Sequence, residues 1–133
     1  MYYLYFDGAS RGNPGPASYG FVIIDDNHRE LEVGCDYIGK ATNNVAEYTG
    51  IMRGLERAIQ HEYLDLTVYG DSELIIKQLK KEYRTNSILK PYFEKCYDML
   101  QKFNVITLNH VKRDKNRRAD QLANIVLDNE LQK

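Results

Sequence analysis

The fold is decided by the stretch YYLYFDGASRGNPGP, which occupies residues 2–16. Aromatic and branched side chains fill its first positions, which predicts an extended strand over residues 2–6. Glycine and proline follow within a few residues, and both favour turns. Asp7 stands at this boundary, so we expect its carboxylate to end a buried strand and face a loop. An aspartate placed this way more often caps a turn than takes part in catalysis, unless other acids are placed alike.

Length and composition predict a single globular domain over residues 1–133. The chain is 43% hydrophobic and 28% charged, and its length suffices for one buried core. No apolar run approaches the roughly 18 residues of a membrane helix, and no signal peptide follows Met1, so we expect a cytoplasmic protein without membrane contact. Cys35 and Cys96 lack the spacing of metal ligands, and we interpret both as buried free thiols.

Charge is distributed unevenly along the chain, although the formal net charge is only -1. Residues 1–70 carry ten acids and five bases, whereas residues 71–133 carry nine acids and thirteen bases. Five of these bases lie between Lys112 and Arg118. Such a cluster either holds a polyanion or forms a solvated charged face, and charge alone does not decide between them.

Periodicity predicts an α/β protein. Alternating apolar residues and intervening turns indicate antiparallel strands over residues 2–6, 18–24 and 30–38. Apolar residues three and four apart then predict a helix of about four to five turns, which the side chain of Thr42 would cap. A strand after this helix implies a parallel crossover. The remaining elements are expected as a strand at 64–69, a short helix from Leu74, a helix at 88–103, a strand at 105–108 and a last helix.

Two of these helices carry more specific expectations. Gly50 and Gly54 lie four residues apart, which suggests that the first long helix approaches another backbone closely. Asn116 is expected to cap the last helix. That helix should pack through the apolar side chains Ala119, Leu122, Ala123 and Val126.

Three further acids are placed as Asp7 is. Asp71 follows a predicted strand, while Glu47 and Asp120 lie early in helices whose starts should meet the strand ends. Four carboxylates in one apolar pocket raise one another's pKa, and divalent cations would resolve that conflict. Oxygen ligands favour Mg²⁺ or Mn²⁺ over Zn²⁺. Taken singly, each acid can also be explained as a capping or surface carboxylate.

Four motifs, in this order and spacing, resemble type 1 ribonuclease H. They are FDGASRGNPGP at residues 6–16, TNNVAEY at 42–48, YGDS at 69–72 and NRRADQLAN at 116–124. The resemblance implies a five-stranded mixed sheet of order 3-2-1-4-5, flanked by helices on both faces. It also implies an endoribonuclease that hydrolyses the RNA strand of RNA/DNA hybrids by two-metal-ion catalysis, leaving 5′-phosphate and 3′-hydroxyl ends.

The resemblance also implies roles for individual residues. Two Mg²⁺ ions, which Mn²⁺ would replace, are the implied cofactors. Amide side chains suit the minor groove of a hybrid, because they can both donate a hydrogen bond to a 2′-hydroxyl and accept one from it. The alternative for the asparagines is helix capping and turn formation. By matching position, the catalytic metal ligands are Asp7, Glu47, Asp71 and Asp120, and the substrate-binding residues are Gly8, Ser10, Asn13, Thr42, Asn43, Asn44 and Ser72.

Two features depart from the pattern of this family. Many members carry a histidine in the loop before the last acid, but residues 112–115 contain none, and the bases of this loop would then assist product release. His110 matches a position usually held by a structural residue. A basic protrusion that some members insert between two helices is absent. The bases from Lys77 to Lys95 would partly replace it, with Tyr83 as a stacking surface.

Two alternatives remain beside the main hypothesis. The chain could be a non-catalytic module that binds hybrids or duplexes, or it could apply the same chemistry to double-stranded RNA as well. A monomer is expected in each case, because one core uses all of the apolar patterns.

Overall fold

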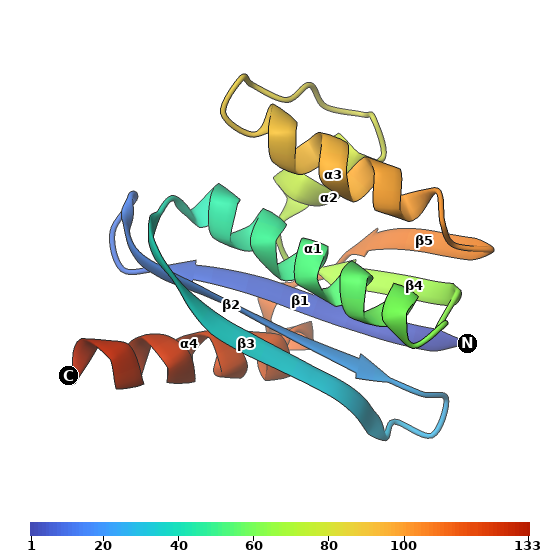
Figure 1. Ribbon diagram of the computed structural model, residues 1–133, viewed down its shortest axis with the longest axis horizontal. Coiled ribbons are helices and arrows are strands. Elements are labelled where there is room, and N and C mark those ends of the chain that lie inside the picture. The colour runs from blue at the N-terminus through green and yellow to red at the C-terminus, as the bar shows by residue number, and fades with distance from the viewer.

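The computed structural model describes residues 1–133 as one sheet with helices on both faces (Figure 1). Its strands are β1 (Tyr2–Ser10), β2 (Gly15–Ile24), β3 (Glu30–Ala41), β4 (Asp65–Gly70) and β5 (Val105–His110). Its α-helices are α1 (Asn43–Gln60), α2 (Glu73–Leu79), α3 (Lys90–Leu100) and α4 (Arg117–Leu131), and a short 3₁₀-helix, η1 (Arg113–Lys115), precedes α4.

The five strands lie in the order β3-β2-β1-β4-β5. The β1–β2 and β2–β3 pairs are antiparallel, whereas the β1–β4 and β4–β5 pairs are parallel. The predicted mixed sheet and its strand order are therefore confirmed. Strand β1 lies at the centre of this order, and its side chains Leu4 and Phe6 are fully buried.

Strand β1 is longer than the sequence indicated, and this changes the position of Asp7. The parallel pairing with β4 stops at Phe6, opposite Gly70, but the antiparallel pairing with β2 continues to Ser10, opposite Ala17. Asp7 thus lies within β1 and not at its end. It still lines the cavity beside the end of β4, because the β1–β4 pairing stops one residue before Asp7.

Helices α1, α2 and α3 cover one face of the sheet, and α4 covers the other (Figure 1). On the first face, Tyr48, Ile51 and Leu55 of α1 are fully buried. On the second face, α4 lies so close to β2 that a Cβ added to Gly20 would lie 2.6 Å from the carbonyl oxygen of Ala119. The two helical layers therefore both reach the sheet edge at which β4 ends.

Two expectations about side-chain burial are wrong. Cys96 is buried as predicted, but Cys35 is exposed, because it lies on the edge strand β3. Leu127, not Val126, completes the buried face of α4. The close approach expected of α1 to another backbone is confirmed at Gly50, which lies against Asp7, whereas Gly54 faces the side chain of Leu4. No helix combines the length and apolar character needed to cross a membrane.

Candidate active site

Four acidic side chains from four different elements line one cavity of about 360 Å³ at this edge of the sheet. Asp7 comes from β1, Glu47 from α1 and Asp120 from α4, while Asp71 directly follows β4. Carboxylate oxygens of Asp7, Glu47 and Asp71 lie within 4.8 Å of one another. Asp120 lies on the wall of the same cavity, outside this group of three.

The local backbone explains why Glu47 meets Asp7. Thr42 caps α1 as predicted, because its hydroxyl accepts a hydrogen bond from the backbone N–H of Val45 at 3.2 Å. Glu47 then lies in the second turn of α1, beside Gly8. A Cβ added to Gly8 would lie 2.3 Å from the backbone nitrogen of Glu47, so no larger residue fits there. The missing side chain thus allows α1 to bring its acid to β1.

Burial dominates the electrostatics of the three clustered acids. Asp7 is 4% exposed and Glu47 is 9% exposed. Burial, opposed by hydrogen bonding to Glu47, raises the pKa of Asp7 to about 7. Burial and the neighbouring Asp7 raise the pKa of Glu47 well above its usual range, and burial also raises the pKa of Asp71. All three shifts favour the neutral acid when no cation is bound.

This set of donors suits a divalent cation. The Oε2 atom of Glu47 is buried and has no hydrogen-bond partner, which is costly unless something else binds it. The three clustered acids supply oxygen donors only, as hard cations such as Mg²⁺ and Mn²⁺ prefer. A cation among these acids would both neutralise their mutual repulsion and satisfy the buried oxygen atom.

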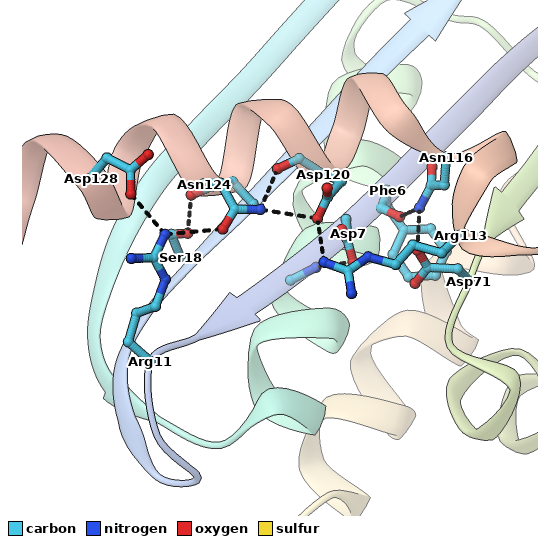
Figure 2. Close-up of polar contacts among 12 residues, drawn as sticks. Phe6, Asp7, Arg11, Ser18, Asp71, Arg113, Asn116, Asp120, Asn124 and Asp128 are labelled. Carbon is cyan, nitrogen blue, oxygen red and sulfur yellow. Dashed lines mark hydrogen bonds and ion pairs between the residues drawn. The ribbon is translucent and has the colours of Figure 1, made fainter.

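Asp120 is held differently from the other three acids. Its Oδ1 atom accepts hydrogen bonds from Arg113 at 3.4 Å and from the side-chain amide of Asn124 at 3.0 Å (Figure 2). Arg113 and Asn124 line the cavity, and so does Arg11 from the β1–β2 turn. Neither Asn124 nor Arg11 was predicted to have a role. The one available signal for Asn124 was its position one helical turn after Asp120.

Asn116 does not cap α4 with its side chain, contrary to expectation. Its Nδ2 atom instead donates to the carbonyl oxygen of Phe6 at 2.8 Å and to Oδ2 of Asp71 at 3.4 Å (Figure 2). Asn116 is 1% exposed, so these contacts are shielded from water. The side chain therefore joins the start of α4 to β1 and to one of the clustered acids.

Comparisons with known proteins agree with this architecture. The family model described as "Reverse transcriptase-like" matches residues 5–126. Ribonuclease HI of Halobacterium salinarum is 42% identical over 127 residues, which cover 95% of this chain and 64% of that protein. The crystal structure of RNase H1 from H. salinarum superimposes with a TM-score of 0.92, at 42% identity, over 96% of this chain and 98% of that one. The chain belongs to the type 1 ribonuclease H family.

A further structure in the comparison is LC11-RNase H1 in complex with an RNA/DNA hybrid. It superimposes with a TM-score of 0.91 at 37% identity, over 98% of this chain and 99% of that one. Both the predicted family and the predicted fold are thus confirmed. This chain spans 64% of the length of H. salinarum Ribonuclease HI, so that protein contains sequence with no counterpart here.

Three of the seven residues predicted to bind substrate line the cavity, and four do not. Gly8, Ser10 and Asn43 line it. Asn13 lies beside Asn43, and its Oδ1 atom accepts a hydrogen bond from the backbone N–H of Asn43 at 3.0 Å. The four residues outside the cavity lining are Asn13, Thr42, Asn44 and Ser72.

Capping accounts for two of these four. Ser72 caps α2, because its hydroxyl accepts a hydrogen bond from the backbone N–H of Ile75 at 3.4 Å, and Thr42 caps α1. His110, at the end of β5, also lies outside the cavity, with Nδ1 at 4.0 Å from Oε2 of Glu73. Capping and substrate contact are compatible, because a capping hydroxyl uses only part of its hydrogen-bonding capacity.

A second hollow lies between α2, α3 and the loop that joins them, with a volume of about 520 Å³. Tyr83 on this loop is 45% exposed, and the Nζ atom of Lys77 lies 5.1 Å from the centre of its ring. Lys81, Arg84 and Lys90 also line the hollow or its rim. Some of the basic residues expected to replace the protrusion therefore share one hollow with an exposed aromatic ring.

Proposed function

We propose that residues 1–133 form a single catalytic domain that hydrolyses the RNA strand of RNA/DNA hybrids. The observation that carries this proposal is the approach of three carboxylates, from Asp7, Glu47 and Asp71, to within 4.8 Å of one another. The complex of LC11-RNase H1 with an RNA/DNA hybrid supports the choice of substrate. The expected products carry 5′-phosphate and 3′-hydroxyl ends.

Metal binding by the four acids is central to this proposal. Asp7, Glu47, Asp71 and Asp120 would hold two Mg²⁺ ions, for which Mn²⁺ would substitute. When bound, such an ion pair activates a water for attack on phosphorus and stabilises the departing 3′ oxygen. The carboxylates fix the cation positions because they project from different elements of one rigid sheet edge. No protein side chain is then required as nucleophile.

The surrounding residues would orient the substrate. The backbone of Gly8 and the side chains of Ser10 and Asn43 lie on the cavity wall, where they would face the RNA strand. Asn13, Asn44, Thr42 and Ser72 lie at the adjoining surface, where we propose contacts to the minor groove and to the DNA strand. Because these groups meet sugars and phosphates more than base edges, little sequence preference is expected.

Substitution of Asp71 by asparagine tests the proposal. Asn keeps the size of Asp but removes a charge that the cations need, so the Asp71→Asn protein should bind a labelled hybrid and leave it intact. The wild type should cut it only with Mg²⁺ or Mn²⁺ present. Asp98→Asn, on the exposed side of α3, is a matched control that should cleave normally. Undiminished cleavage by purified Asp71→Asn protein would refute the proposal.

A second candidate keeps this chemistry and adds double-stranded RNA as a substrate. It is favoured by the short connection between α2 and α3, residues 80–89, which contains no inserted helix to grip a DNA strand. Side-by-side cleavage of matched hybrid, RNA duplex and DNA duplex separates the two candidates. A hybrid bound but left uncut in Mn²⁺ would indicate a binding module instead. A monomer in the cytoplasm stays a prediction.

A further inference from the structure

A row of four polar side chains runs along one side of α4 from the residue before it, and two of them, Asp120 and Asn124, line the cavity. Asn116, Asp120, Asn124 and Asp128 follow one another at intervals of four residues, so they lie along one side of the helix. Figure 2 shows this row extending from the clustered acids toward the β1–β2 turn, where Arg11 meets its far end. The row therefore connects the carboxylates with a turn that borders the cavity.

Asn124 is the central member of this row and contacts both neighbours. Its Nδ2 atom donates to Oδ1 of Asp120 at 3.0 Å and to the backbone oxygen of Asp120 at 2.9 Å. Its Oδ1 atom accepts a hydrogen bond from Arg11 at 3.1 Å. If the amide of Asn124 were rotated by half a turn, its NH₂ group would face the N–H donors of Arg11. Its oxygen would then face the acceptor oxygens of Asp120. Arg11 thus fixes which end of the amide faces the acid.

Arg11 is itself anchored, so it can impose this orientation. Its guanidinium pairs with Oδ1 of Asp128 at 2.8 Å, and its backbone N–H donates to the carbonyl oxygen of Pro16 at 2.8 Å. The first contact ties the side chain to α4, and the second holds the turn closed. Arg11 therefore links the turn to the same helix that carries Asp120.

We propose that Asn124, oriented by Arg11, is a positioning residue for Asp120. Asp120 is the acid that lies outside the group of three, and its other side-chain partner, Arg113, is 78% exposed. Asn124 is the less exposed of the two partners, and both ends of its amide make hydrogen bonds. This inference rests on the proposed function, since it states that Arg11 and Asn124 place one of the acids needed for hydrolysis.

A purely structural role for Asn124 makes a different prediction. Its bond to the backbone oxygen of Asp120 would then stabilise α4 only, and its loss would lower stability without a specific effect on the acid. Kinetic measurements distinguish positioning of Asp120 from stabilisation of α4. A misplaced Asp120 lowers the rate of the chemical step while hybrid binding persists. They also separate in a comparison of single and double variants.

The kinetic experiment uses Asn124→Ala, Arg11→Ala and the double variant, with Asn129→Ala as matched control. Asn129 is an exposed asparagine of α4, remote from the cavity lining. Loss of one hydrogen bond to a charged group should lower kcat for the hybrid about tenfold in Asn124→Ala, with KM within about twofold of wild type. The double variant should have the kcat of Asn124→Ala. Equal kcat in Asn124→Ala and Asn129→Ala, or multiplicative losses in the double variant, would overturn the proposal.

Calorimetric titration with Mn²⁺ alone provides a readout that does not depend on cleavage. Asn124→Ala should weaken Mn²⁺ binding several-fold in the wild-type background and not at all in an Asp120→Ala background. Equal weakening in both backgrounds would contradict positioning. If the wild type left the hybrid uncut while this pattern held, the proposed function would fail and the positioning role would stand. Circular dichroism and thermal melts establish that each variant is folded.

Discussion

Gly50 lies directly against the backbone of Asp7: a Cβ added to Gly50 would lie 2.7 Å from the carbonyl oxygen of Asp7. One turn earlier in α1, Glu47 meets Gly8 of β1 with similar closeness. Helix and strand therefore touch backbone to backbone at two points, and these points flank the two buried acids. The carboxylates of Asp7 and Glu47 can therefore lie close together because Gly8 and Gly50 have no side chains.

Substitution of Gly50 by alanine should be destabilising. Alanine favours a helix by about 1 kcal/mol over glycine, but here its methyl group would force α1 away from β1, and overpacking of this kind costs about 1–3 kcal/mol. Urea denaturation should therefore show a loss of stability, with weaker Mn²⁺ binding. Arg53→Ala, at an exposed position of the same helix, is the control, because it adds no group between α1 and β1. A Gly50→Ala protein as stable as wild type would contradict this account of the contact.

Asn116→Ala should also lower stability, for a different reason. The substitution leaves the carbonyl oxygen of Phe6 without its side-chain donor in a region shielded from water. An unsatisfied buried group costs about 1–3 kcal/mol. The midpoint of urea denaturation should fall accordingly, while the Asn129→Ala control should keep the wild-type midpoint. Equal midpoints for the two variants would argue that water replaces the amide.

Metal-free protein should lose stability as the pH rises from about 4 to 7. The pKa of Asp7 is about 7 in the folded protein against an ordinary value of 3.8. Within this window the folded state holds a proton that the unfolded chain has released, so raising the pH favours unfolding. Asp7→Asn should flatten this dependence in urea denaturation at several pH values. A slope that is identical in wild type and Asp7→Asn would rule out Asp7 as its source.

Divalent cations should reverse this trend at pH 8. A cation that binds the folded state and not the unfolded chain raises stability with its concentration. Thermal melts at pH 8 should therefore shift upward with Mg²⁺ in wild type, and much less in Asp71→Asn, which lacks one of the clustered charges. A matched titration with KCl controls for ionic strength. An equal shift in both proteins would indicate cation binding elsewhere.

The two cysteines should differ sharply in reactivity. Cys35 is exposed on β3, whereas Cys96 is fully buried and burial raises the pKa of its thiol to about 12. A disulfide reagent such as DTNB should modify one thiol in the folded protein and a second only after unfolding. Cys35→Ser should abolish the first reaction. Two thiols reacting at the same rate before unfolding would show that the region around Cys96 opens readily.

The features that the sequence predicted well are local or strongly patterned. The Thr42 cap, the length of α1 and the burial of Phe6 follow from residue type and periodicity, and they are confirmed. The strand order followed from the resemblance to the ribonuclease H family. Periodicity alone would not have given it, because alternation within a strand says nothing of which strand lies beside it.

The errors arise where partners distant in sequence decide the outcome. We predicted that Cys35 would be buried, but β3 is an edge strand that α1 and α4 cover incompletely, and the packing of these helices determines which residues remain exposed. Asn116 stands at a position typical of a cap, and the carbonyl oxygen that its amide meets belongs to Phe6, 110 residues earlier. Arg11 and Asn124 were missed for the same reason, since 113 residues separate them.

The four acids are spread from β1 to α4, so the cavity is assembled from nearly the whole length of the chain. During synthesis on the ribosome, the first three acids emerge well before Asp120 does. The α4 wall, which carries Asp120, is therefore the last part of the cavity to be synthesised. A chain truncated before α4 would lack both Asp120 and Asn124, so it could not form the cavity with its complete set of carboxylates.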